Sequence, residues 1–170
     1  MGYLYPMSVL NGRRARSSFT GITFAGAGQN LDTGCKVVLN APDTSATVET
    51  KGISKSGGIQ TFRSSIVATP KAEGSKATVS CQSLMLDDQS RSDTIPAMDI
   101  RAKNVDIGHE ATIGRIGDDK VFYLMSRGLD LAEAQRLVVE ASFNPVLDRI
   151  PDEELKAEID TYLQRRLSNG

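Results

Sequence analysis

Residues 81–115 read CQSLMLDDQSRSDTIPAMDIRAKNVDIGHEATIGR. In this stretch short apolar runs alternate with turn-forming clusters, and no helical period persists over a full helix length. It contains the only histidine of the chain, His109, with Glu110 beside it, and one of the two cysteines, Cys81. The runs predict short β-strands, and the three side chains are potential ligands for a soft or borderline metal ion.

The same alternation of short apolar runs and turn-forming clusters extends from residue 3 to about residue 116. Two of its runs, 45–50 and 78–81, alternate polar and apolar residues, as strands with one buried face do. A sandwich, a barrel and a β-solenoid all fit this pattern. The runs are spaced more widely than in most sandwiches, but no strict short repeat marks a simple solenoid.

The pattern changes at Gly117, after which helices are expected. Acidic residues begin the run 118–125 and Gly128 follows it, which is the polarity that a helix dipole favours. We therefore expect a β-domain over residues 1–116 and a helical domain over residues 117–170.

Two longer helices should complete the helical part. Residues 130–143 place apolar side chains on one helical face, and Asp130 and Glu133 have capping-box spacing. Pro145 should end or kink this helix, and Pro151 should open the next one. These helices either pack on the β-domain and on each other, or dock a partner.

Composition excludes several classes of protein. The net charge is −1 over 170 residues, with acids and bases interspersed, so a nucleic-acid interface is not expected. No apolar run approaches the roughly 18 residues of a membrane span, and the first residues lack a signal-peptide core. Two cysteines are too few for a disulfide framework, so we expect a cytoplasmic protein with reduced thiols. Because the sequence has no P-loop motif, no nucleotide site of that kind is expected.

Each residue of the opening stretch also has an ordinary structural interpretation. Cys81, in an alternating strand, fits a small buried hydrophobic position, and a lone histidine such as His109 is more often structural than catalytic. Neighbouring strand residues point to opposite faces, so His109 and Glu110 would chelate one ion only if the backbone bent, for example at Gly108.

Two further groups have a weaker chemical signal. Cys35 follows residues 32–34, which read as a turn, and fits a strand position. Asp87, Asp88 and Asp93 could bind a hard cation or serve a carbohydrate hydrolase or lyase, but they fit an exposed turn better.

Beyond these single residues, the run 90–139 resembles the SufB/SufD family of iron–sulfur cluster assembly scaffolds. The motifs that carry the resemblance are residues 109–112, 117–119, 122–123 and 127–128, with 32–34, 51–54 and 62–63 upstream. The resemblance covers nearly the whole chain, which matches the C-terminal part of the longer family members. It implies a right-handed parallel β-helix, here partial, followed by a small helical domain.

The resemblance also implies a function. The chain would be a SufB-like scaffold and not an enzyme. Cys81, His109 and Glu110 would hold a transient iron–sulfur cluster at a dimer interface with a second copy or a SufB/SufD paralogue. A cysteine-desulfurase system would supply the sulfur. The alternative is a SufD-like structural and docking subunit that does not ligate iron.

The helical tail, by the same resemblance, would dock a SufC-like ABC-type ATPase, with no nucleotide bound by this chain. The expected docking residues are Phe122, Tyr123, Leu137, Val138, Phe143, Val146 and Leu147.

Overall fold

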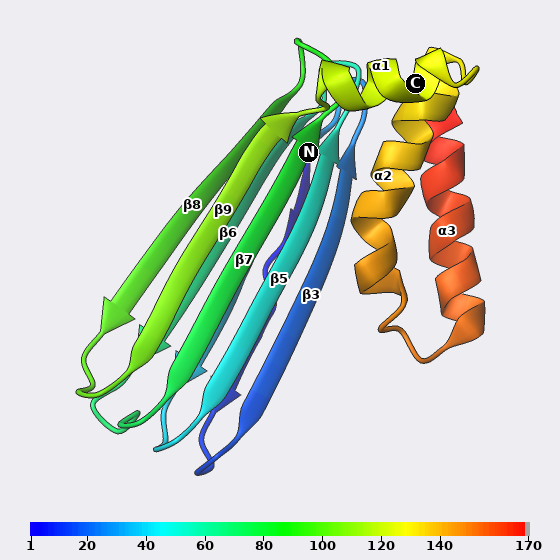
Figure 1. The fold of residues 1–170 in the computed structure, drawn as a ribbon. Coiled ribbons are helices and arrows are strands. Elements are labelled where there is room, and N and C mark those ends of the chain that lie inside the picture. Colours follow the sequence, from blue (N-terminus) through cyan, green and yellow to red (C-terminus); the bar gives the residue numbers. More distant parts are fainter. Residues whose placement is uncertain (169–170) are drawn as a thin grey trace.

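The computed structural model describes residues 1–168 as a stack of long strands followed by helices (Figure 1). Within those residues there are nine strands and three helices. In chain order they are β1 (Gly2–Leu4), β2 (Met7–Leu10), β3 (Arg16–Ala25), β4 (Asn30–Leu39), β5 (Ser45–Ser54), β6 (Ile59–Ala68), β7 (Lys76–Met85), β8 (Arg91–Ile100), β9 (Asp106–Arg115), α1 (Asp118–Ser126), α2 (Leu131–Leu147) and α3 (Glu153–Ser168). The prediction of a mainly β chain with C-terminal helices is confirmed.

The strands form two parallel sheets, which we call sheet A and sheet B. In sheet A, β4, β6 and β8 are neighbours, and β1 and β2 both pair with β4; sheet B has the order β3-β5-β7-β9. Successive long strands alternate between the sheets, so each strand pairs with the next but one and the chain winds into a solenoid. A sandwich of antiparallel strands and a barrel are therefore excluded.

The solenoid core lies between the two sheets. Alternate side chains point inward, and Val37, Val48, Ile66 and Val79 are almost fully buried in one cluster. Burying one such side chain contributes about 1.5–3 kcal/mol to folding. The cluster occupies the C-terminal halves of β4 and β6 and the N-terminal halves of β5 and β7.

Residues 32–34, predicted to be a turn, lie inside β4 instead. Gly34 is needed there because a Cβ atom would collide with the Tyr5 ring and with the carbonyl oxygen of Arg63. The small polar residues that suggested a turn therefore reflect close strand packing.

The helix boundaries follow the capping signals. The Asp130 side chain accepts a hydrogen bond from the Glu133 backbone, and the Glu133 side chain accepts one in return, which confirms the capping box. Pro145 lies inside α2, and the helix ends two residues later. A proline so close to the end removes one late hydrogen bond, so the effect on the helix is small. Pro151 precedes α3, whose first turn donates two backbone hydrogen bonds to Asp152.

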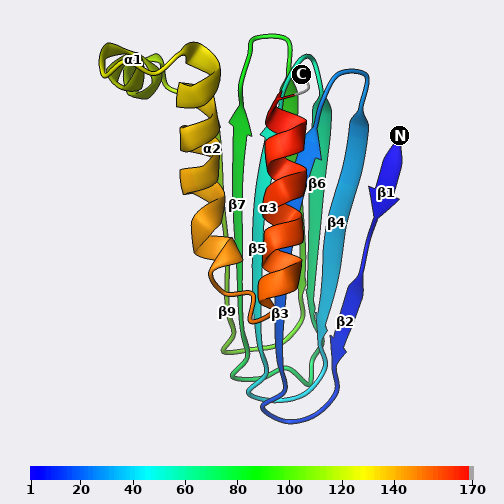
Figure 2. The same cartoon turned by 90° about the vertical axis from the view of Figure 1, so that its right-hand side faces the viewer.

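Helices α2 and α3 lie side by side against the outer face of sheet B (Figure 2). Phe143 and Val139 of α2 pack in one cluster with Phe24 and Ile53 of the sheet. Near the end of α3, the Arg166 guanidinium stacks 5.3 Å from the centroid of the Phe24 ring. The helical segment therefore shares a hydrophobic core with the solenoid.

Candidate functional site at the end of the solenoid

Cys81 projects into the solenoid interior from β7. It follows Ala77 and Val79 on the inward row of this strand, and it is 3% exposed. The alternating sequence Lys76–Gln82 explains this placement, because every second residue of a strand faces the same side. The thiol is free and reduced.

His109 faces the same interior from the next rung. It lies beside Val79 in the β7–β9 ladder, and Ala111 lies beside Cys81. The half-buried imidazole places Nε2 at 3.6 Å from the Cys81 Sγ. The fold therefore brings together two side chains that are 28 positions apart.

Glu110 does not join this pair. It lies beside Ser80 in the ladder, on the outer face of sheet B. β9 runs as regular strand through Gly108, so the bend that could have turned Glu110 inward is absent. Among the described residues, no group of three or more His, Cys, Asp or Glu side chains is placed to hold a metal ion. Within one copy, Glu110 therefore does not meet Cys81 and His109, as the alternation of side chains along a regular strand predicts.

Cys35 also points into the interior, from β4, and belongs to the same core cluster as Cys81. Burial, with a smaller contribution from the neighbouring Cys81 thiol, raises the pKa of Cys35 to about 11. The Cys35 thiol therefore stays protonated near neutral pH, which suits the predicted packing position.

The pair lies near the open end of the solenoid. β8 and β9 are the last strands of their sheets, and within residues 1–168 no further rung covers their inward side chains. Met98 and Ile100 of β8 are consequently 41% and 47% exposed, and Ile113 of β9 is similarly open. An apolar surface with free strand edges thus adjoins the cysteine–histidine pair.

The other half of the interior is polar. A cavity of about 250 Å³ lies there, lined in part by Thr50 and Ser83. Gln60 Nε2 and Ser92 Oγ are buried in this half without a hydrogen-bond partner in the described part of the chain. Thr23 donates to the Gln60 Oε1 at 2.7 Å.

On the outer face of sheet A, Asp32 accepts hydrogen bonds from Arg63 and Tyr5. The Arg63 guanidinium, more than the Tyr5 hydroxyl, holds the pKa of Asp32 below its usual range. This group lies on the opposite side of β4 from the interior and does not touch the cysteine–histidine pair.

The expected docking residues divide into two groups. Phe122 is 73% exposed on α1. A groove of about 510 Å³ between α1 and α2 is lined in part by Tyr123, Leu137 and Val138. The other three are buried in this chain's own structure. They are Phe143, Val146 and Leu147. Since these three hold α2 in place, they do not form a free surface, and that part of the expectation is wrong.

The sequence of most of this chain matches a known family. Residues 1–142 match the family model described as "SUF system FeS cluster assembly, SufBD core domain", and the chain belongs to this family. It is 39% identical over 149 residues to the iron–sulfur cluster assembly protein SufB of Bacillus subtilis, covering 88% of this chain and 32% of that protein. An iron–sulfur cluster assembly SufBD family protein of Mycobacterium bovis is 38% identical over 149 residues, covering 88% of this chain and 18% of that protein.

This chain therefore spans a third or less of the length of these curated relatives. Within residues 1–168, no helix combines the length and apolar character that crossing a bilayer requires.

Proposed function

We propose that this chain is a SufB-like scaffold on which an iron–sulfur cluster forms at the open end of the solenoid. The observation that carries the proposal is the 3.6 Å separation between Cys81 Sγ and His109 Nε2. Thiolate and imidazole are suitable ligands for iron. Both lie on inward rows of the last two rungs, beside an apolar surface that a partner would cover.

One copy supplies too few ligands for a cluster. Cys81 and His109 leave the remaining positions to sulfide and to side chains of a second SufB- or SufD-type chain. The cluster is a cargo, and a site divided between two chains can open to release it. The chain acts as a scaffold without catalysis, in the cytoplasm, and a cysteine-desulfurase system supplies the sulfur.

The helical segment has a second role in this proposal. Tyr123, Leu137 and Val138 line the α1–α2 groove, and Phe122 is exposed on α1. An isolated exposed apolar side chain needs no explanation, but several around one groove mark an interaction surface. We assign this surface to an ABC-type ATPase of the SufC kind. A SufD-like subunit would use the groove without ligating iron.

Anaerobic reconstitution with ferrous iron and sulfide tests the assignment of the ligands. We expect wild type to develop the charge-transfer absorption of a cluster, and Cys81→Ser and His109→Ala to lose most of it. Cys35→Ser is the matched control, because it replaces the other inward thiol outside the pair, and it should retain the signal.

Equal absorption in wild type, Cys81→Ser and His109→Ala would place the ligands elsewhere. The chain would then be better described as a SufD-like docking subunit. Circular dichroism of each variant separates lost ligation from lost folding.

A further inference from the structure

The polar half of the solenoid interior contains buried groups that need a hydrogen-bonding partner. Gln60 of β6 is 4% exposed, and its Nε2 atom has no acceptor in the described part of the chain. Ser92, the ladder partner of Gln60 in β8, has a buried Oγ atom that is likewise unpaired within those residues. Leaving a buried N–H or O–H group unpaired costs stability, so both groups are expected to have a partner.

The position of the Gln60 side chain is fixed by the opposite sheet. Its Oε1 accepts a hydrogen bond from Thr23 of β3 at 2.7 Å. A Cβ atom on Gly52 of β5 would collide with the Gln60 amide, so the glycine makes room for this group. Gly52 belongs to residues 51–54, one of the motifs that carry the family resemblance. The amide is therefore held across the interior, with Nε2 left to bind something else.

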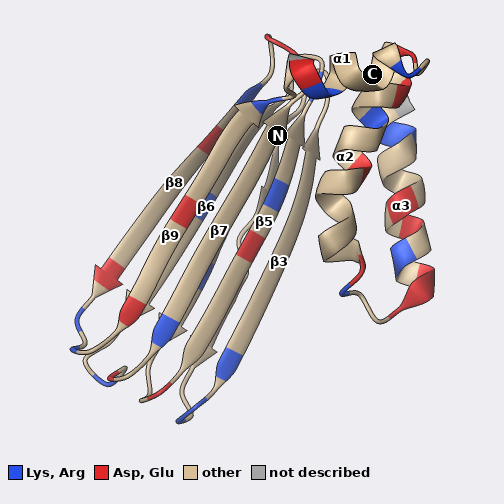
Figure 3. Cartoon of the chain, in the orientation of Figure 1, with Lys and Arg blue, Asp and Glu red and all other residues tan. Residues whose placement is uncertain are grey.

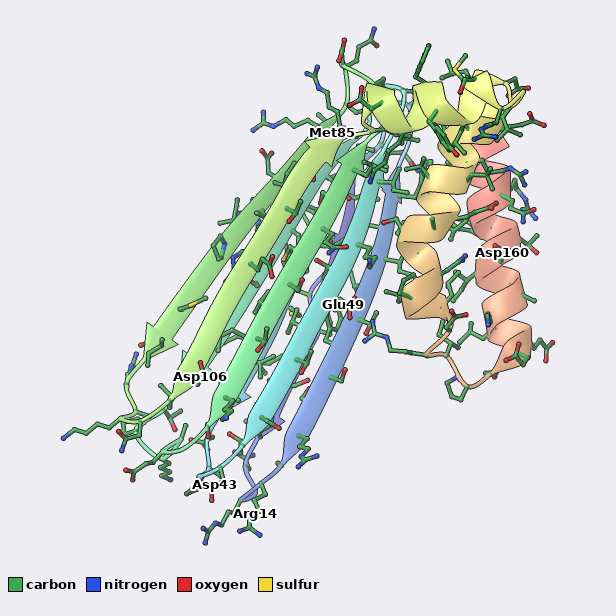
Figure 4. The ribbon with its side chains drawn as sticks, viewed as in Figure 1. Arg14, Asp43, Glu49, Met85, Asp106 and Asp160 are labelled. Atoms are coloured by element: carbon green, nitrogen blue, oxygen red, sulfur yellow. The ribbon has the colours of Figure 1, made fainter. Side chains whose placement is uncertain are left out.

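A cavity lies beside these unpaired groups. Its volume is about 250 Å³, and Gln60, Ser92, Thr50 and Ser83 are among the residues that line it. Beyond Ser83, the next inward residue of β7 is Met85, which ends the strand and is labelled in Figure 4. A water molecule takes about 30 Å³ in the liquid, so the cavity has room for several.

The lining suits a neutral ligand that both donates and accepts hydrogen bonds. Charged residues form only scattered bands along the strands (Figure 3). Among the described residues that line the cavity, Asp93 alone is charged, and it is paired with Arg91 at 2.8 Å. An ion in the cavity would lose its hydration without an opposite charge to replace it. Gln60 Nε2 requires an acceptor, whereas the hydroxyl groups can donate or accept, and water satisfies both.

We propose that this half of the solenoid is a hydration site that holds several bound water molecules. Neighbouring strands lie about 4.8 Å apart, a span that one water bridges with two hydrogen bonds, so a single water can join Gln60 Nε2 to the Ser92 hydroxyl. Further waters reach the Thr50 and Ser83 hydroxyls of sheet B. The bound water therefore links β8, the last strand of sheet A, to the opposite sheet and stabilises the last rung.

Nuclear magnetic resonance of the chain without iron or sulfide tests the proposal directly. The side-chain amide protons of Gln60 should show cross-relaxation with long-lived water. In ¹⁷O relaxation dispersion, Gln60→Met keeps the length of the side chain but cannot bind water, so it should lose at least about one long-lived internal water. The same variant should lower the urea midpoint by roughly 0.5 M, because hydrogen bonds to Thr23 and to water are lost.

Ile66→Met is the matched control. It exchanges two side chains of similar volume at an inward position of the same strand, in the apolar half of the interior. The number of long-lived waters should equal that of wild type.

Three results would contradict the proposal. The first is a wild-type Gln60 amide without cross-relaxation to long-lived water, a measurement that does not depend on how any variant folds. The second is an unchanged number of long-lived waters in Gln60→Met. The third is a raised urea midpoint in that variant, because removing an unpaired amide from a dry cavity stabilises a fold. Since no iron is present, these results are independent of the reconstitution experiment.

Discussion

The inner rungs and the last rung carry the same alternation of side chains but differ in what covers them. Ile66 in β6 and Met98 in β8 are direct ladder partners on the inward face, yet they are 1% and 41% exposed. The same holds for Val79, fully buried in β7, and His109, half-buried beside it in β9. The difference shows that stacking, and not the local pattern, decides which inward positions become core and which stay available for chemistry.

The largest expected effect comes from placing a charge at matched positions of the two rungs. Ile66→Asp buries an unpaired carboxylate and should cost about 4 kcal/mol or more, enough to prevent stable folding. Met98→Asp keeps its carboxylate in water and should cost less than about 1 kcal/mol. Urea unfolding followed by circular dichroism measures both. Similar losses for the two variants would mean that the last rung is covered within this chain.

A second comparison extends the contrast to the outer face of sheet B. Phe143→Ala removes a ring that is fully buried between α2 and the sheet, and it should cost about 3 kcal/mol. Phe122→Ala removes an exposed ring on α1, and it should change stability by less than about 0.5 kcal/mol. Thermal unfolding of the two variants gives the values. A large loss for Phe122→Ala would show that α1 packs more tightly than its exposure indicates.

The smallest effect concerns the thiol of Cys35 in the inner rungs. Its pKa is raised from 9.0 to about 11 in the folded chain, so the unfolded chain loses this proton first as the pH rises. Its contribution to stability is therefore intact below about pH 9 and declines between pH 9 and 11. Cys35→Ala should flatten that decline when unfolding free energy is measured against pH, after allowing for the constant cost of the lost packing. An unchanged slope would mean that other groups cause it.

Much of this fold could be predicted from local sequence. The short alternating runs indicated strands, and Asp130 with Glu133 indicated the start of α2, because alternation and capping depend on neighbouring residues only. The choice of a solenoid over a sandwich or a barrel came from the family resemblance, since pairing between distant strands leaves no local signal.

Two predictions, a turn at residues 32–34 and a docking role for Phe143, failed because contacts between distant residues leave no local signal. Residues 32–34 look like a turn, but they lie in β4, where Gly34 accommodates the Tyr5 ring from the link between β1 and β2. Phe143 has the apolar character of a docking residue, but the sheet already covers it. In both cases a tertiary contact determined the role of a residue whose local sequence allowed two.

The same distinction between local sequence and tertiary contacts applies to the candidate site. The sequence by itself determined that Cys81 and His109 lie on strands and that His109 and Glu110 face opposite sides, because side-chain direction alternates along an extended backbone. Only the tertiary structure decided that Cys81 and His109 lie 3.6 Å apart and that Glu110 faces outward at a free edge. The register of β7 against β9 sets the distance between Cys81 and His109 and the position of Glu110. This register depends on how whole rungs stack, and the sequence of a single strand does not determine that stacking.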